Sequence, residues 1–294
     1  MREPSRATRA SAVVPGPRRQ GNTTRVRSRY GRRMEDPNRT KPDPTVYPIV
    51  GVVRDAIVDA TGPSLVGLYV YGSLATGDFE PHVSDIDLIA VLRDRPDEAL
   101  LRRLAKMHEG LERTEPEWKD RIEVDYVSAR GLAHCRTHAT TIVRISPGEP
   151  LHMIEAGRDF LLDWYPARKD GISLRGPRLD SLVPPIPEAE YLEEVRKYLA
   201  GFRDRFDDDA SSRSQAYAIL TMCRGVAALR FGQPLSKREA GARIQREFPP
   251  WSPLIDRALS WRDQRWDDDQ PDGSGTVAET QGFIAEMEDV LGLS

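Results

Sequence analysis

Four polar residues beside two apolar runs have the types and spacing to hold a phosphate and a metal ion. Gly72 and Ser73 end one apolar run, and Asp85 and Asp87 open the next. Side chains alternate along a strand, so the two aspartates project to the same side. Glycine lets backbone N–H groups approach phosphate oxygens closely, and hard cations such as Mg²⁺ take carboxylate oxygens. The pattern therefore indicates a site for a metal-bound phosphate.

A further carboxylate is available on another predicted strand. Residues 121–127 alternate strictly, which puts Glu123 and Asp125 on one face and the apolar side chains on the other. Either carboxylate could bind a second metal ion or take the proton of an attacking hydroxyl as a general base. The residues leave the choice between Glu123 and Asp125 open.

The elements that must position these side chains form a small mixed sheet with helices packed on it. Apolar periodicity predicts a helix over 47–60 and another from Pro96. Buried strands are predicted at 65–71, 86–92 and 121–127. Farther along, we expect a strand over 139–145, a helix over 158–165 that ends at Pro166, and a strand over 171–177. An α+β domain over 45–186 follows from this order.

The remainder, 187–294, is predicted to be an all-α helical bundle domain. The proline-rich connector 184–187 separates it from the sheet, because proline continues neither a helix nor a ladder. Helical stripes cover 188–206, 215–230, 252–262 and 276–291. Ser236 and Glu239 match a capping box, which starts a helix at Lys237. A lysine at a helix N-terminus is a sensible anion site, although a solvated lysine explains it as well.

Composition limits the classes of protein that the chain can be. Its 294 residues exceed the usual size of a single core, which agrees with two domains. With 39% hydrophobic residues and no apolar run near the roughly 18 residues of a membrane span, we expect a soluble protein with no membrane partner. Cys135 and Cys223 are far apart and lack metal-binding spacing, which favours buried free thiols in a reducing, cytoplasmic compartment.

Charge is distributed unevenly along the chain. Residues 1–33 hold ten arginines and one acid, so the rest carries 33 basic and 45 acidic residues. We expect 1–44 to be a disordered Arg-rich extension, with Met34 as an alternative start. An acidic body disfavours nucleic acid and attracts a metal ion or a cationic small molecule. Solubility alone would explain the same surface.

Together these motifs resemble a known superfamily. An apolar residue, Gly-Ser, a spacer of eleven residues and Asp-x-Asp between apolar residues resemble the nucleotidyltransferase signature. From about Leu65 to Arg262 the chain resembles the streptomycin and spectinomycin adenylyltransferases. The segments that carry this resemblance are 68–73, 84–88, 122–124, 182–184, 218–224 and 236–240.

The resemblance implies Mg²⁺- and ATP-dependent adenylyl transfer to a hydroxyl of an aminoglycoside-type antibiotic, and hence resistance. In that family the two aspartates bind magnesium, the glutamate of the third strand is the base, and the lysine after the serine contacts ATP phosphate. These roles would fall on Asp85, Asp87, Glu123 and Lys237, with Gly72 and Ser73 holding the nucleotide.

The acceptor region departs from the family. The family carries an aromatic residue after the third strand that helps to hold the aminoglycoside, and 141–149 has none. The family's acids before the Leu-Cys-Arg helix are replaced by 211–214, with Asp207 to Asp209 a few residues earlier. Two alternatives stay open: a nucleotidyltransferase with a different acceptor, such as a protein, and a non-catalytic ligand-binding protein on the same fold.

Overall fold

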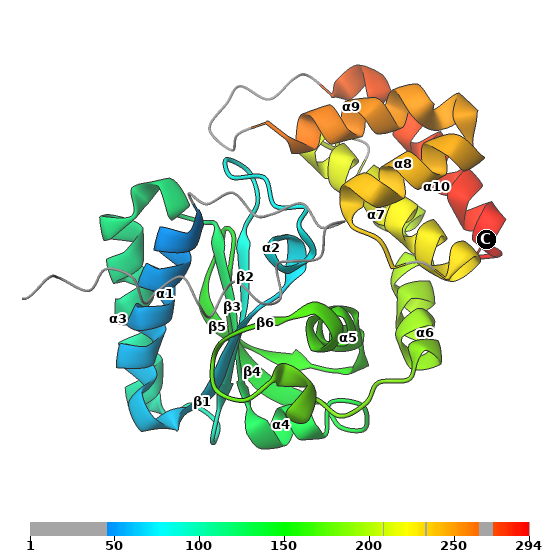
Figure 1. The fold of residues 1–294 in the computed structure, drawn as a ribbon. Coiled ribbons are helices and arrows are strands. Elements are labelled where there is room, and N and C mark those ends of the chain that lie inside the picture. Colours follow the sequence, from blue (N-terminus) through cyan, green and yellow to red (C-terminus); the bar gives the residue numbers. More distant parts are fainter. Residues whose placement is uncertain (1–45, 208, 233, 265–272, 294) are drawn as a thin grey trace, which may run out of the picture. The chain divides into compact units, whose positions relative to one another are not determined.

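A mixed sheet of six strands carries the predicted site, in the order β5-β4-β3-β2-β1-β6 (Figure 1). Among the described strands only β2 and β3 run parallel, and every other pair of neighbours is antiparallel. The strands are β1 (Leu65–Val70), β2 (Ile86–Leu92), β3 (Ile122–Ser128), β4 (Thr140–Ser146), β5 (Glu149–Ala156) and β6 (Ile172–Arg175). The predicted small mixed sheet is confirmed.

The computed structural model describes residues 46–207, 209–232, 234–264 and 273–293. The extension 1–44, including the alternative start Met34, lies outside the described residues, as do Asp208 and the acidic run 267–269. Residues 40–294 belong to one unit by their contacts. The boundary between 45–186 and 187–294 thus stays a prediction.

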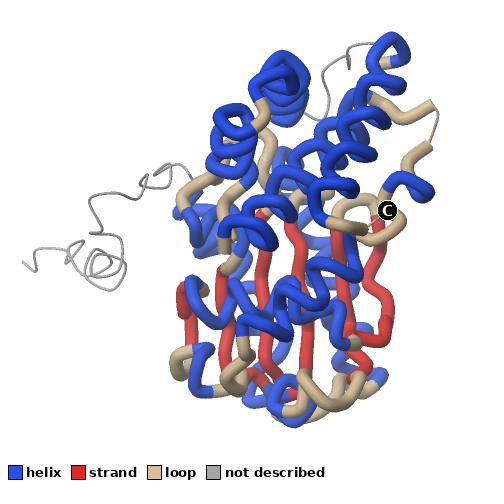
Figure 2. The backbone as a smooth tube through the Cα atoms, turned by 90° about the vertical axis from the view of Figure 1, so that its right-hand side faces the viewer, coloured by secondary structure: helices blue, strands red, loops and turns tan. Residues whose placement is uncertain are grey.

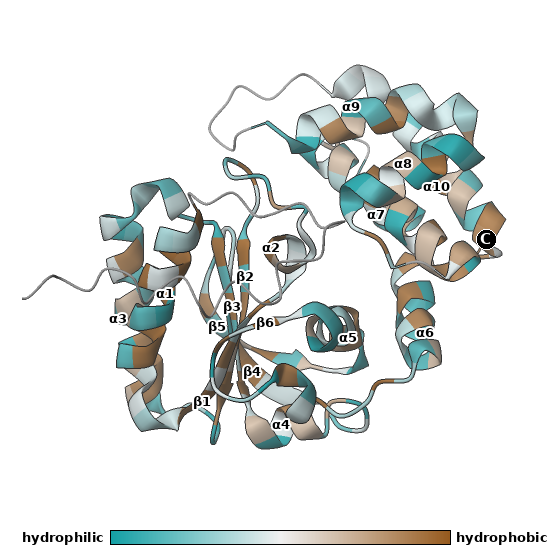
Figure 3. Ribbon diagram, in the orientation of Figure 1, coloured by the Kyte–Doolittle hydropathy of each residue, from teal (hydrophilic) through white to brown (hydrophobic). Residues whose placement is uncertain are grey.

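Each face of the sheet has its own helices and its own core (Figure 1). Helices α1 (Val46–Thr61) and α3 (Glu98–Thr114) pack on one face, against Leu68, Leu88 and Val124 among others. The short α4 (Ala129–Ala133) and α5 (Leu161–Asp170) cover the other, where Ile89, Val127 and Trp164 are buried. Hydrophobic colouring follows the central strands in Figure 3. Strand alternation therefore directs Asp87, Glu123 and Asp125 to the face of α4 and α5.

Helices make up the remainder of the described chain (Figure 2). They are α6 (Glu188–Leu199), α7 (Ser212–Phe231), α8 (Lys237–Glu247), α9 (Ser252–Arg262) and α10 (Val277–Leu291). Helix α7 contacts the four others, and its Ile219, Met222 and Val226 are completely buried. It ends at Gly232, which is left-handed at φ 63°. The predicted helical region after the sheet is confirmed.

Three elements differ from their predictions. Helix α5 does not end at Pro166 but continues to Asp170, because the buried Trp164 and Ala167 anchor the turns on both sides of the proline. Helix α6 ends at Leu199 and not at Phe206, since Gly201 turns the backbone left-handed at φ 67°. Strand β5 was not predicted; it is an exposed edge strand with little apolar patterning.

No helix of the described residues is both long and apolar enough to span a bilayer. Both cysteines, Cys135 and Cys223, are buried free thiols, as predicted.

Candidate active site

Three of the predicted carboxylates meet where β1 ends and β2 and β3 begin. Asp85 directly precedes β2, and Asp87 is the second residue of that strand. The parallel register sets Asp87 opposite Glu123 of β3. Both side chains point to the same face, so the sheet brings together two carboxylates that are 36 residues apart in the sequence.

Gly72 is required by its contact with one of these aspartates. Its φ is 63°, and a Cβ built on it would lie 2.0 Å from Oδ2 of Asp87. A side chain here would thus be strained and would also displace the carboxylate. The neighbouring Tyr71 N–H donates to the Asp87 carbonyl over 3.0 Å. The turn that carries Ser73, in the short helix α2 (Gly72–Thr76), is therefore held against the start of β2.

Asp85 has a raised proton affinity. Burial raises its pKa to about 6, and the positive charges of Arg121, Lys237 and Arg213 oppose that shift. Its Oδ1 atom is buried and has no hydrogen-bond partner. A buried acceptor without a donor is unfavourable, so a cation bound at this atom would stabilise the ionised side chain.

Burial and neighbouring negative charges raise the pKa of both Asp87 and Glu123. Burial raises the pKa of Asp87 well above its usual range, with Glu123 and Asp85 adding to the effect. Burial likewise raises the pKa of Glu123 to about 7, and only Arg144 among its main neighbours lowers it. A carboxyl group that exchanges its proton near neutral pH has the properties of a general base.

Asp125, the alternative base, is engaged elsewhere. It is completely buried, lies opposite Arg144 of β4, and accepts two hydrogen bonds from that guanidinium, at 2.6 Å to Nε and 2.7 Å to Nη2. Burial raises the pKa of Asp125, although this ion pair opposes the rise. The same Arg144 is 3.5 Å from Glu123, whose side chain keeps 21% exposure. Of the two carboxylates, only Glu123 is accessible to a substrate.

Lys237 reaches the carboxylates from the helical region. It is the first residue of α8, whose N-cap Ser236 forms the predicted capping box with Glu239. Burial lowers the pKa of Lys237, as do Arg224 and Arg262, whereas Asp87 and Asp85 act in the opposite direction. Its ammonium group is 5.9 Å from the ring centre of Tyr217. The lysine and the two aspartates therefore belong to one electrostatic cluster.

Ionic contacts fix α8 and α9 to the loop that links the Gly-Ser turn to β2. Asp78 in that loop is 3.5 Å from both Arg238 and Arg262, and Arg262 also donates to the Asp78 carbonyl over 2.9 Å. Arg238 adds a contact of 3.6 Å to Glu80. These bonds hold Lys237, which precedes Arg238, near the site.

The sequence patterns missed Arg144, Asp163 and the tyrosines Tyr198 and Tyr217. Asp163 of α5 lies 3.7 Å from Arg144 and raises the pKa of Asp87 and of Glu123. None of these residues lies in a motif, and each reaches the site from a different element. The apolar periodicity of the sequence assigns them only to the polar side of a helix or strand. No local sequence signal could therefore have identified them as site residues.

The donor set suits a divalent cation that is also held by a second molecule. Asp85 and Asp87 offer hard carboxylate oxygens, one of them buried and unpaired. Within the described residues, no three His, Cys, Asp or Glu side chains converge as a complete metal site. The two aspartates fit Mg²⁺ if phosphate or water oxygens complete its coordination.

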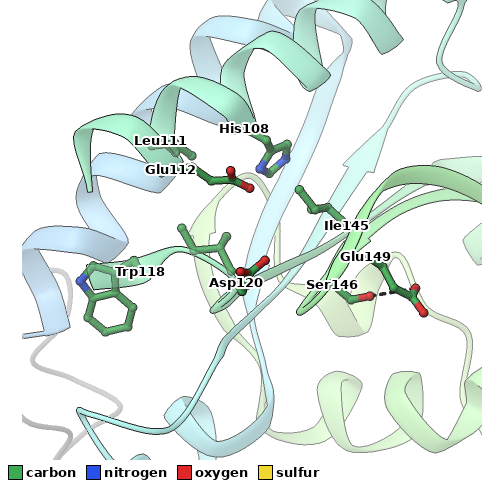
Figure 4. A pocket seen from close by; sticks show the side chains of 9 residues that line it. His108, Leu111, Glu112, Trp118, Asp120, Ile145, Ser146 and Glu149 are labelled. Carbon is green, nitrogen blue, oxygen red and sulfur yellow. Dashed lines mark hydrogen bonds between the residues drawn. The ribbon is translucent and has the colours of Figure 1, made fainter. Parts of the chain in front are cut away.

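A separate hollow lies on the opposite face of β3 (Figure 4). Ile122 lines it, together with His108 and Glu112 of α3 and with Ser146 and Glu149 near the β4–β5 turn. Ile122 faces away from Glu123, and the predicted site residues do not line this hollow. It has no part in the carboxylate cluster.

Two family models match the chain. Residues 54–137 match the nucleotidyltransferase domain, and residues 181–287 match the C-terminal domain of aminoglycoside adenylyltransferase. No curated protein sequence matches significantly.

Two solved structures are similar to the chain to different degrees. The crystal structure of spectinomycin adenyltransferase AAD(9) from Enterococcus faecialis with ATP and spectinomycin matches 81% of this chain and 99% of its own, at 17% identity and a TM-score of 0.63. A toxin–antitoxin structure with AMP-PNP matches 51% of this chain and 83% of its own, at 18% identity and a TM-score of 0.24. At this low identity, the similarity to the adenyltransferase structure shows a shared fold.

Proposed function

Since the chain is an enzyme that belongs to the aminoglycoside adenylyltransferases of the nucleotidyltransferase superfamily, we propose that it transfers the adenylyl group of ATP to a hydroxyl of an aminoglycoside-type acceptor similar to streptomycin or spectinomycin. The observation that carries this proposal is the position of Glu123 beside Asp87, on which the charge of Lys237 acts. That the fold is shared with an adenyltransferase crystallised with ATP and spectinomycin supports both substrates.

The nucleotide would bind between the Gly-Ser turn and α8. Gly72 lets the backbone of the turn lie close against the Asp87 carboxylate, which would hold the bound metal ion, and the Ser73 hydroxyl can donate to a phosphate oxygen. Lys237 supplies a positive charge at the N-terminus of an eleven-residue helix, which favours an anion. We assign the triphosphate to these three residues.

Asp85 and Asp87 would hold Mg²⁺ together with the phosphates. The raised pKa of both side chains and the unpaired Oδ1 of Asp85 support this assignment, because burial disfavours the two negative charges more than the nearby basic side chains stabilise them. When bound, the ion would neutralise phosphate charge and align the triphosphate for displacement. The aspartates contribute the fixed geometry that this alignment needs.

Glu123 is the base that we assign to the acceptor. Its carboxylate takes the proton of the acceptor hydroxyl while the hydroxyl oxygen forms a bond to the α-phosphorus. The bond from that phosphorus to the bridging oxygen breaks, and pyrophosphate leaves toward Lys237. A base with a pKa of about 7 suits this transfer at neutral pH. Asp125 does not share the role, because Arg144 occupies both of its oxygens.

A pyrophosphate-release assay tests the activity. The full chain would be incubated with ATP and Mg²⁺ alone, and then with streptomycin, spectinomycin and further aminoglycosides. We expect release that depends on one or more of these acceptors and is abolished by EDTA. If no acceptor stimulates release, the proposed reaction is wrong, and an acceptor of another class or a non-catalytic binding role takes its place.

Antibiotic resistance in the cytoplasm is the physiological role that we propose. The buried free thiols agree with a reducing compartment. Expression in a susceptible bacterium should raise the minimum inhibitory concentration of the drug that stimulates pyrophosphate release, and of no unrelated antibiotic. The Glu123→Gln variant, expressed at the same level, is the control and should leave the host susceptible.

A further inference from the structure

Asp163 presents a partly exposed carboxylate to the site, and among the described residues its ion pairing is weak. Its side chain is 41% exposed, and the contact of 3.7 Å to Arg144 is the shortest ion pair it makes among the described residues. That guanidinium already makes two shorter bonds to Asp125. Burial raises the pKa of Asp163 to about 6, and an incoming ammonium group would favour its ionised form.

The position of Asp163 is next to the proposed base. Helix α5 buries Leu161, Trp164 and Ala167 against the sheet, which leaves Asp163 on a different side of the helix. Its negative charge acts on Glu123 and on Asp87, so it lies within electrostatic range of both. If Asp163 bound an ammonium group of the acceptor, the hydroxyl groups next to that ammonium group would lie close to Glu123.

An exposed pair of tyrosines continues from Asp163 toward Lys237. The hydroxyl groups of Tyr198 (α6) and Tyr217 (α7) are 2.6 Å apart and share a hydrogen bond, although their side chains are 37% and 50% exposed. The charge of Asp163 also acts on Tyr198, and Tyr217 lies under Lys237. Side chains from α5, α6, α7 and α8 thus lie within contact or electrostatic range of one another.

The exposure of this pair needs an explanation. Large exposed hydrophobic side chains are few in the described residues, namely Val52, Met153, Tyr198 and Tyr217, and only the tyrosines touch each other. Tyrosine rings offer apolar surface to the C–H face of a sugar or cyclitol ring and a hydroxyl to its polar edge. A carboxylate beside them offers a partner for an ammonium group.

We propose that Asp163 and Tyr198 form the acceptor-binding wall of this chain, with Asp163 receiving an ammonium group of an aminocyclitol and Tyr198 packing on its ring. Tyr217 holds Tyr198 in place through the hydroxyl contact. This inference rests on the proposed adenylyl transfer. It also explains how the chain can bind such an acceptor without an aromatic residue in 141–149 and without acids in 211–214.

Steady-state kinetics with separate variation of ATP and acceptor tests the wall. Asp163→Asn should raise the KM for streptomycin or spectinomycin about tenfold and leave the KM for ATP within about twofold. Asp163→Glu, which keeps the charge, should recover most of the loss. Asp59→Asn removes an exposed acid on α1 and should change neither constant. Added salt should raise the acceptor KM of the parent chain more than that of Asp163→Asn.

The tyrosines are tested by a second pair of variants. Tyr198→Ala should raise the acceptor KM about tenfold, whereas Tyr198→Phe, which keeps the ring, should raise it by about threefold or less. Melting temperatures within a few degrees of the parent would establish that each variant folds. Calorimetric titration of the ATP-loaded protein with the same drugs measures acceptor binding without turnover.

The outcomes separate the two proposals. Normal turnover with an unchanged acceptor KM in Asp163→Asn and Tyr198→Ala would overturn the acceptor wall and leave adenylyl transfer intact. Absence of pyrophosphate release with every acceptor would overturn the reaction. In that case, drug binding that is weakened by Asp163→Asn would still support the wall, and binding that is absent or unaffected would overturn it too.

Discussion

Glu123 and Asp125 are two carboxylates on the same face of β3, and their surroundings differ completely. Asp125 is buried and bonded to Arg144 through both oxygens. Glu123 is partly exposed, and its nearest cation, the same Arg144, is 3.5 Å away. Burial raises the pKa of both, but one carboxylate is bonded through both oxygens within the sheet and the other keeps part of its surface exposed. The comparison shows that a single arginine on the neighbouring strand can engage one carboxylate fully and leave the next one on the same face accessible.

The strongest way to test this comparison is to neutralise Glu123. Glu123→Gln should lower kcat about 10³-fold, because a general base contributes roughly 10²- to 10⁴-fold, while the dissociation constant for ATP stays within about twofold. Pyrophosphate release and calorimetric ATP binding measure the two quantities. Retention of full activity would contradict the assignment of the base to Glu123.

Breaking the Arg144 pair should affect stability. Arg144→Met leaves Asp125 buried without a partner, which we expect to lower the free energy of unfolding by about 3 kcal/mol. Urea denaturation followed by circular dichroism measures it. Arg102→Met is the matched control: it removes an ion pair to Glu98 with highly exposed side chains and should change stability by about 0.5 kcal/mol or less. Equal effects would contradict a structural role for the buried pair.

Substitution of two glycines with similar φ angles distinguishes the cost of backbone strain from the cost of a clash with Asp87. Gly72→Ala adds a methyl group against Asp87, whereas Gly148, at φ 76°, has nothing within 4 Å of its built Cβ. Gly148→Ala should cost about 1 kcal/mol from the left-handed backbone alone, and Gly72→Ala about 2 kcal/mol or more because overpacking adds to it. Only Gly72→Ala should also impair ATP binding. Equal losses in both assays would contradict the close contact.

The smallest expected effect is a shift in pH dependence. Because Glu123 must be ionised to act as a base, kcat/KM for ATP, which reports the free enzyme, should fall as the pH decreases below about 7. Asp163 raises the pKa of Glu123, so Asp163→Asn should lower that pKa and move the acidic limb to lower pH by less than about one unit. A shift toward higher pH would contradict the sign of this interaction.

Stability should have its own pH dependence in the absence of ligands. Asp85 and Glu123 have folded pKa values of about 6 and about 7, above their ordinary values of 3.8 and 4.5. The folded state therefore binds more protons than the unfolded state between these limits, and its stability should fall as the pH rises from about 4 to about 7. Asp85→Asn should flatten this decline, as measured by urea denaturation across the pH range.

Sequence patterns predicted those parts of the fold that depend on local order. The strands at 65–71, 86–92 and 121–127 are recognisable because their residues are apolar on both faces or alternate strictly, and the capping box at Ser236 is a contact between residues three apart. Predictions were wrong where tertiary contacts override local preference. Pro166 is accommodated inside α5 by buried neighbours, and the exposed edge strand β5 is defined by its pairing with β4.

The sequence by itself determined the candidate chemistry, namely two aspartates at alternate strand positions, a glycine and serine before them, and carboxylates on a later strand. Only the tertiary structure decided how these groups differ. Arg144 is 19 residues from Asp125 and neutralises it across the sheet, and α5, α6 and α7 bring Asp163 and the tyrosines to the same place. The physical reason is that proton affinity depends on burial and on charges within several ångströms, and those charges come from segments that are distant in the sequence.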